Sequence, residues 1–266
     1  MIDELITADV DGGRLVYRQA GHGPPLVLLH GFLCDSRCWK PQLKGLSDRF
    51  RVIAWDAPGA GSSPDPSEPF TTANYAHCLA AFLDAIGVEK PHVLGLSWGG
   101  ILAQEFYRLY PDRPRSLVLA GTYAGWRGSL AEEVWTARLA SCLADAAGQP
   151  EAVGAKFVQG VFTAAASNEL CAEFSAIVSE FHPVGFRLMS LSSAETDTRA
   201  LLSRIAVPTL LLWGDEDRRS PMHVAKQFAE AMPDAELAVI ANAGHLSNME
   251  QPEAFNAHVR RFCMSA

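Results

Sequence analysis

The segment HVLGLSWGG holds the clearest chemical signal of the sequence, the pattern Gly95-x-Ser97-x-Gly99. An apolar run typical of a strand precedes the pattern, and the amphipathic stretch ILAQEFYRLY follows it. A serine at such a strand–turn–helix junction is held in strained backbone geometry, which the flanking glycines tolerate because they have no Cβ. The turn presents the hydroxyl at the carboxyl edge of the sheet, beside a helix N-terminus that favours negative charge. We therefore predict that Ser97 is a nucleophile.

A serine hydroxyl needs a neighbouring base to attack a carbonyl at neutral pH, and the base needs a partner that orients it. His245 is the predicted base, because it follows the last strand-like run in a Gly-containing loop and so lies at the same sheet edge as Ser97. For the orienting acid, the run TLLLWGDEDRRSP offers Asp215, Glu216 and Asp217. We favour Asp217, which lies far enough into the loop to turn toward the imidazole, and expect Asp215 to brace the turn.

Two backbone N–H groups are expected to stabilise the oxyanion that forms when a serine attacks a carbonyl. In this kind of site one donor belongs to the residue after the nucleophile, here Trp98. The other comes from the loop after an earlier strand, here Phe32 in the run LLHGF. The nearby His30 ends a buried strand, so we expect it to be structural and not catalytic.

Short apolar runs alternate with helix-like segments along the chain, and this alternation predicts a sheet that helices cover on both faces. The runs ELITADV and RLVYRQA, joined by the turn Asp11–Gly12–Gly13, predict a hairpin. Further strands are predicted at 26–29, 51–55, 92–96, 116–121, 209–213 and 236–240. Helices are predicted at about 36–47, 72–86, 98–110, 222–232 and 252–263.

The stretch between Gly121 and Pro208 breaks this alternation. It is Ala-rich with helical periodicity and has no convincing strand, and a structureless loop of this length is implausible in one domain. We predict a core formed by residues 1–121 and 208–266, and a helical cap formed by residues 122–207. Its apolar side chains are candidates either for a substrate pocket or for ordinary packing of cap on core: Trp126, Trp135, Phe162, Phe181 and Met189.

Composition excludes several classes of function. There are 30 Asp and Glu against 22 Lys and Arg, a net charge of −8, so we expect no binding to nucleic acid or to a membrane. No apolar run is long enough to cross a bilayer, and the acidic N-terminus does not resemble a secretory signal, so a cytoplasmic protein is expected. The six scattered cysteines and the lack of nucleotide-binding or zinc motifs predict no cofactor and no metal.

The motifs, taken in order, resemble those of the α/β-hydrolase superfamily: HGF at 30–32, WDAPGAGSS at 55–63, GLSWGG at 95–100, WGDED at 213–217 and AGH at 243–245. The resemblance covers the chain outside the insertion. It implies an α/β-hydrolase fold, with a mostly parallel eight-stranded sheet, helices on both faces and an inserted helical cap. It implies the same roles for Ser97, Asp217, His245, Phe32 and Trp98, and a structural role for Asp56.

We predict a serine hydrolase that cleaves a carboxylic ester or lactone of a small, largely apolar substrate through an acyl-enzyme. Two enzymes with the same triad are alternatives, a carbon–carbon bond hydrolase and a prolyl aminopeptidase. A small-molecule sensor built on a hydrolase fold is a third, because fold alone does not decide function. An aminopeptidase would need an acid for the substrate ammonium, but the cap acids are more typical of a solvated helix face: Glu132, Glu133, Glu169, Glu173 and Glu180.

Overall fold

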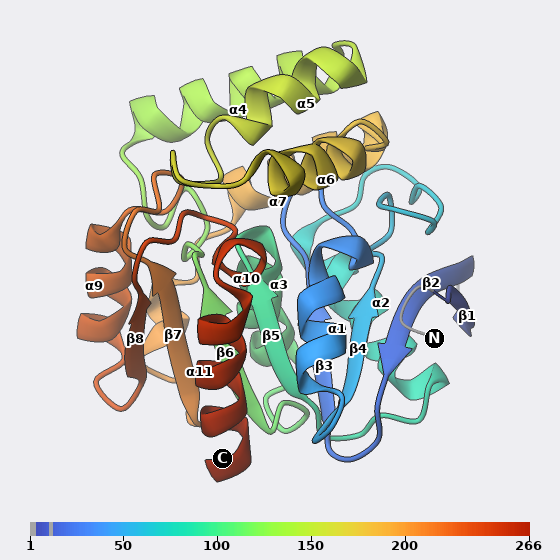
Figure 1. The fold of residues 1–266 in the computed structure, drawn as a ribbon, viewed down its shortest axis with the longest axis vertical. Helices are drawn as coiled ribbons and strands as arrows, with labels where there is room; N and C mark the ends of the chain where they lie inside the picture. Colours follow the sequence, from blue (N-terminus) through green and yellow to red (C-terminus); the bar gives the residue numbers. More distant parts are fainter. Residues whose placement is uncertain (1–3, 11–12) are drawn as a thin grey trace.

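An eight-stranded sheet forms the centre of the computed structural model, which describes residues 4–10 and 13–266 (Figure 1). The strands are β1 (Ile6–Val10), β2 (Gly13–Ala20), β3 (Pro25–Leu29), β4 (Arg51–Trp55), β5 (His92–Leu96), β6 (Ser116–Ala120), β7 (Thr209–Gly214) and β8 (Glu236–Ile240). They lie in the order β1-β2-β4-β3-β5-β6-β7-β8. Among the strand pairs of the described residues, only β1–β2 and β2–β4 are antiparallel, which confirms the predicted mostly parallel sheet.

The predicted hairpin is β1 paired with β2, with Val10 opposite Gly13. The turn residues Asp11 and Gly12 lie outside the described residues. The central strands β5, β6 and β7 bury every residue, whereas the edge strand β8 alternates between buried and exposed positions. Strands covered on both faces therefore account for the continuous apolar runs of the sequence.

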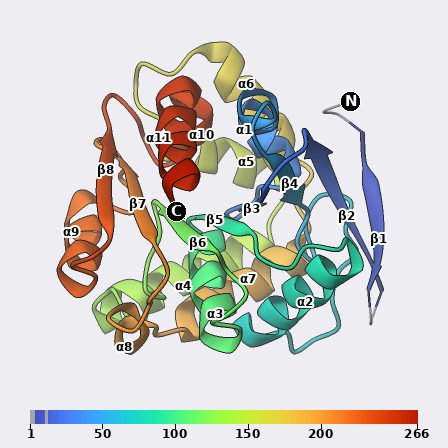
Figure 2. The ribbon, with the colours of Figure 1, turned by 90° about the horizontal axis from the view of Figure 1, so that it is seen from below.

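Helices cover both faces of this sheet (Figure 2). On one side lie α1 (Lys40–Leu46) and α11 (Pro252–Ser265), and on the other lie α2 (Thr72–Ala85) and α3 (Trp98–Leu109). The helix α9 (Met222–Ala231) packs against β7 and β8. Short turns of helix are η1 (Ser36–Trp39), α8 (Arg199–Leu202) and α10 (Ser247–Glu250). The predicted helices outside the insertion are all confirmed to within a few residues.

Four helices of the insertion stack above the carboxyl edge of the sheet (Figure 1). They are α4 (Glu132–Ala146), α5 (Pro150–Val158), α6 (Asn168–Val178) and α7 (Pro183–Glu195), and the described chain between β6 and β7 contains no strand. Among residues 4–10 and 13–266 we find no helix with the length and apolar character needed to cross a bilayer. The cytoplasmic location stays a prediction from the sequence.

The cap helix α7 approaches the core backbone closely at a pair of glycines. A Cβ added to Gly185 in α7 would lie 1.8 Å from the carbonyl oxygen of Gly59, which follows β4. Nearby, the indole Nε1–H of Trp98 donates to Ser192 Oγ of α7 at 3.0 Å. Packing of this density leaves no room for an extra methyl group without moving the backbone. The contact therefore fixes α7 against the core.

We expect Gly185→Ala to lower the free energy of unfolding by about 1–3 kcal/mol, because the new methyl group forces α7 away from Gly59. Urea unfolding measures the change. Gly154→Ala in α5 is the matched control, since an added Cβ there meets its nearest atom at 3.6 Å, an ordinary contact. The control should be neutral or slightly stabilising. Equal stability of the two variants would contradict the close contact.

Candidate active site

Ser97 lies in a sharp turn between β5 and α3. Its backbone has φ 56° and ψ −117°, a conformation that non-glycine residues rarely adopt. The turn forms because its neighbours lack side chains: a Cβ on Gly95 would lie 2.2 Å from the Gly99 carbonyl oxygen, and one on Gly99 would lie 2.1 Å from that of Leu29. The glycine spacing seen in the sequence thus corresponds to two backbone contacts that only glycine allows.

Hydrogen bonds hold this strained turn in place. The Ser97 N–H donates to the Ala120 carbonyl at 2.8 Å, and the Thr122 hydroxyl donates to the Ser97 carbonyl at 2.6 Å. The Ser97 side chain remains partly exposed and lines a pocket between core and cap. Ala120 at the end of β6 and Thr122 just after it therefore hold the strained turn, while Ser97 lines the pocket.

His245 and Asp217 form a buried pair at the same edge of the sheet. His245 Nδ1 lies 2.8 Å from Asp217 Oδ2, and the two residues are 8% and 5% exposed. The other carboxylate oxygen, Oδ1, accepts the backbone N–H groups of Arg219 and Ser220, each at 2.8 Å. With both oxygens accepting, the carboxylate fixes the proton of the imidazole on Nδ1 and leaves Nε2 as the free, basic nitrogen.

Two residues that had no predicted role in the site hold this pair. Gly121 has φ 49°, and a Cβ there would lie 3.0 Å from Asp217 Oδ2 and 3.3 Å from His245 Nδ1. Glu250 accepts the Gly244 N–H at 2.7 Å through one oxygen and the Thr163 N–H at 2.9 Å through the other. It thereby joins the histidine loop to the cap.

Two further acidic residues near the site, Asp215 and Asp56, bond to backbone N–H groups. Asp215 is exposed and accepts the Ala243 N–H at 3.2 Å, which braces the turn ahead of His245. Asp56 accepts the N–H groups of Ser36 and Ser62 at 2.8 and 2.9 Å. Burial and the nearby carboxylate of Asp35 raise the pKa of Asp56. Both aspartates thus have positions that suit structural roles.

The expected oxyanion donors line the same pocket as Ser97. Trp98 is the first residue of α3, so its N–H has no acceptor within the helix. Phe32 lies in the turn after β3, and both residues line the pocket. His30 holds that turn: its Nδ1–H donates to the Gly31 carbonyl at 2.8 Å, and its Nε2 accepts the Ala57 N–H at 3.1 Å. The imidazole of His30 is therefore used on both sides, as a structural residue would be.

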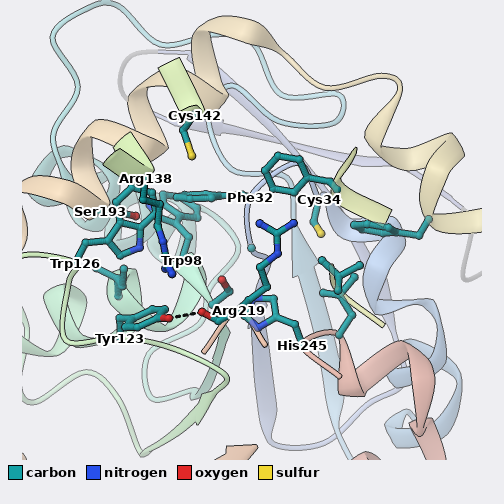
Figure 3. Close-up of a pocket in the computed structure, with 17 residues that line it drawn as sticks. Phe32, Cys34, Trp98, Tyr123, Trp126, Arg138, Cys142, Ser193, Arg219 and His245 are labelled. Carbon is teal, nitrogen blue, oxygen red and sulfur yellow. Dashed lines mark hydrogen bonds between the residues drawn. The ribbon is translucent and has the colours of Figure 1, made fainter. Parts of the chain in front are cut away.

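The pocket itself is a cavity of about 110 Å³ beneath the cap, with Ser97 and His245 in its wall. Figure 3 shows His245 among the side chains that line it. Among the five cap residues considered from the sequence, Trp126 lines it. The other four lie outside its wall: Trp135 stacks under Arg127, Phe162 packs on Phe174, Phe181 packs on Phe186, and Met189 is buried in α7. Those four side chains are thus placed in the packing around the pocket.

Two arginines that the sequence reasoning passed over also line the pocket, Arg138 of α4 and Arg219 of the loop after β7. Arg219 follows Asp217 by two residues, so its position in the loop that carries the acid indicates that it lies near the site. Arg138 precedes Cys142 by four positions, and both face the cavity. Within the described ranges, no group of three or more His, Cys, Asp and Glu side chains is placed to hold a metal ion.

The chain is similar to known hydrolases over nearly its whole length. The family model described as alpha/beta hydrolase fold matches residues 24–252. "Putative carbamate hydrolase RutD" of Azorhizobium caulinodans is 32% identical over 94% of this chain and 94% of its own, and "3-oxoadipate enol-lactonase 2" of Acinetobacter baylyi is 27% identical over 96% and 93%. The solved structure of a thermophilic esterase from Thermogutta terrifontis, malate bound, superposes with a TM-score of 0.90 at 28% identity, covering 98% of each chain.

The buried His30 should make stability depend on pH. Burial lowers its pKa below the usual value near 6.5, so the unfolded chain takes up this proton at a higher pH than the folded protein does. The stability that neutral His30 contributes is present above pH 6.5 and is lost as the pH falls. We expect this proton to lower the free energy of unfolding by up to about 1.4 kcal/mol per pH unit below pH 6.5. Urea unfolding at pH 7 and pH 5 measures the loss of stability, which should be smaller in His30→Gln than in the wild type. Equal losses in the two proteins would contradict the role of His30 in the pH dependence.

Proposed function

The chain belongs to the α/β-hydrolase-fold family, and from this membership we propose that it is a serine hydrolase that cleaves carboxylic esters or lactones through an acyl-enzyme. One observation carries the proposal: a serine in a strained turn lines the same pocket as a histidine that is paired with a buried aspartate. Relatives named as a lactonase and an esterase support the choice of ester bonds. The proposed partner is a small-molecule substrate.

In the proposed reaction, Ser97 Oγ attacks the substrate carbonyl and His245 Nε2 accepts the hydroxyl proton. Asp217 stabilises the imidazolium that forms, because its Oδ2 lies 2.8 Å from Nδ1. The oxyanion is stabilised by the N–H groups of Phe32 and Trp98. His245 then protonates the leaving alkoxide, which departs as an alcohol. Water repeats the sequence on the acyl-enzyme, and its attack releases the carboxylic acid and restores Ser97.

The contents of the pocket weigh against the prolyl aminopeptidase alternative. A substrate ammonium needs an acidic partner, and no Asp or Glu is among the described residues that line the cavity. The five cap glutamates considered for that role are all exposed, and none of them lies in the wall of the pocket. Hydrolysis of an ester or lactone requires no such partner.

We expect Ser97→Ala to abolish hydrolysis of a short p-nitrophenyl ester, with a loss in kcat of at least about 10³-fold, because the nucleophile is removed. Release of p-nitrophenol in the first turnover, followed by a slower steady rate, would support an acyl-enzyme. Mass spectrometry after treatment with a serine-reactive phosphonate checks the assignment independently. Labelling that persists in the variant would contradict Ser97 as the nucleophile.

The two aspartates of the same loop give a matched pair. Asp217→Asn should lower kcat by about 10³–10⁴-fold, because an amide cannot hold the imidazole in the required tautomer and stabilise its charge. Asp215→Asn should cost less than about tenfold, because Asp215 is exposed and only braces the turn. Steady-state kinetics on one ester compares the two. A larger loss at Asp215 than at Asp217 would reverse the assignment.

A relative is named as a putative carbamate hydrolase, so a carbamate is a second candidate substrate. Its carbonyl can be attacked by a serine in the same way. A panel of ester, lactone, carbamate, prolyl-amide and β-diketone substrates ranks the candidates by kcat/KM. The proposal requires the ester or lactone to lead the panel. If a carbamate or a β-diketone had the highest kcat/KM, Ser97 would remain the proposed nucleophile but the proposed substrate class would be wrong.

A further inference from the structure

The pocket that holds Ser97 and His245 carries an excess of positive charge. Arg138 and Arg219 both line it, and no Asp or Glu is among the described residues of its wall. Asp217 lies behind His245 and directs its oxygens to the imidazole and to backbone N–H groups. Across residues 4–10 and 13–266, neither guanidinium forms an ion pair with a carboxylate. A pocket suited only to apolar groups would not need these charges.

The Arg219 guanidinium is held by the pocket wall and not by a counter-ion. Its central carbon lies 4.6 Å above the Phe157 ring, and its Nε–H donates to the Gly160 carbonyl at 3.3 Å. Figure 3 shows the Arg219 side chain reaching into the pocket from beside His245. Because one flat face is covered by a ring and Nε is engaged, the two terminal nitrogens are the donors left for a ligand.

Arg138 is held in a similar way on the cap side. Its guanidinium carbon lies 5.3 Å from the centre of the Tyr123 ring and 5.4 Å from that of the Trp126 ring. Tyr123 also joins the two arginines, because its hydroxyl donates to the Arg219 backbone carbonyl. Aromatic faces orient a guanidinium without neutralising it, so the N–H groups of Arg138 that are not directed at the Tyr123 hydroxyl stay available to an anion.

The two positive charges are close enough to affect each other. Burial lowers the pKa of Arg219 and repulsion from Arg138 lowers it further, while a weaker attraction to the carboxylates of Asp217 and Asp145 raises it. Arginine nonetheless keeps its proton at neutral pH. Bringing an anion between two such groups relieves their repulsion and forms charge-assisted hydrogen bonds, which are roughly twice as strong as neutral ones.

We propose that Arg138 and Arg219 bind a carboxylate carried by the substrate, so that the enzyme acts on short esters or lactones with a second, ionised carboxyl group. This inference rests on the proposed function and names its substrate class. The small cavity, about 110 Å³, favours a short chain between the carboxylate and the scissile carbonyl. The largely apolar substrate expected from the sequence is thereby replaced by an anionic one.

Matched substrates test the charge separately from the shape. Monomethyl succinate, glutarate and adipate are each compared with the methyl ester in which the free carboxylate is an amide, and kcat/KM is measured in a pH-stat. The wild-type protein should prefer the best acid over its amide by about tenfold to hundredfold, the range expected for a charged hydrogen bond. Arg219→Met and Arg138→Met should each reduce this preference about tenfold or more.

Arg218→Met is the matched control, because Arg218 precedes Arg219 in the same loop, is exposed and does not line the pocket. It should retain the wild-type preference. The acid-to-amide ratio is taken within each variant, so a partial folding defect cancels. An equal rate for acid and amide in the wild type, or a preference that survives in both pocket variants, would overturn the inference.

Calorimetric titration with glutarate separates this inference from the proposed function, because it needs no turnover. Binding to the wild type and to Arg218→Met that is weakened at least tenfold in Arg219→Met supports the carboxylate site even if no ester is cleaved. Hydrolysis that depends on Ser97 but shows no acid preference and no glutarate binding would leave the proposed function standing and refute the carboxylate site.

Discussion

The left-handed backbone at Ser97 is the constraint on which the site depends. A serine at φ 56° costs free energy, and the turn exists only because glycine backbones at positions 95 and 99 come within contact of their neighbours. Any side chain there would push β5, α3 and the end of β3 apart. The bonds from Thr122 and to Ala120 hold the strained residue from the next strand. The hydroxyl therefore emerges at a fixed point of the sheet edge.

The remaining parts of the site reach that edge through loops that the core braces. The Asp217 loop is closed by backbone N–H groups, the His245 loop by Glu250, and the turn before Phe32 by His30. Gly121 leaves the space in which the imidazole and carboxylate meet. Each loop follows a different strand of a parallel sheet, and since such strands end at one edge, the residues converge without long connections.

The sheet and the serine turn can be predicted from the sequence, because the residue patterns that specify them are local. Glycines beside Ser97 report backbone contacts, and the continuous apolar runs report strands covered on both faces. The pocket wall is harder to predict, because it depends on how each cap helix is rotated. Trp135 and Arg138 lie three residues apart in α4, yet Arg138 faces the cavity while Trp135 stacks under Arg127. Packing of α4 against α7 sets that rotation, and apolar periodicity alone did not reveal it.

Trp98 connects the serine turn to the cap. Its backbone begins α3 directly after Ser97, and its indole donates a hydrogen bond to Ser192 of α7. The indole also packs edge-on against the Tyr75 ring, with the ring centres 4.9 Å apart. The hydrogen bond to Ser192 and the close backbone contact between Gly59 and Gly185 together fix α7 against the core. Because α7 is bonded to the residue that follows Ser97, any displacement of α7 would also disturb the turn that holds this serine.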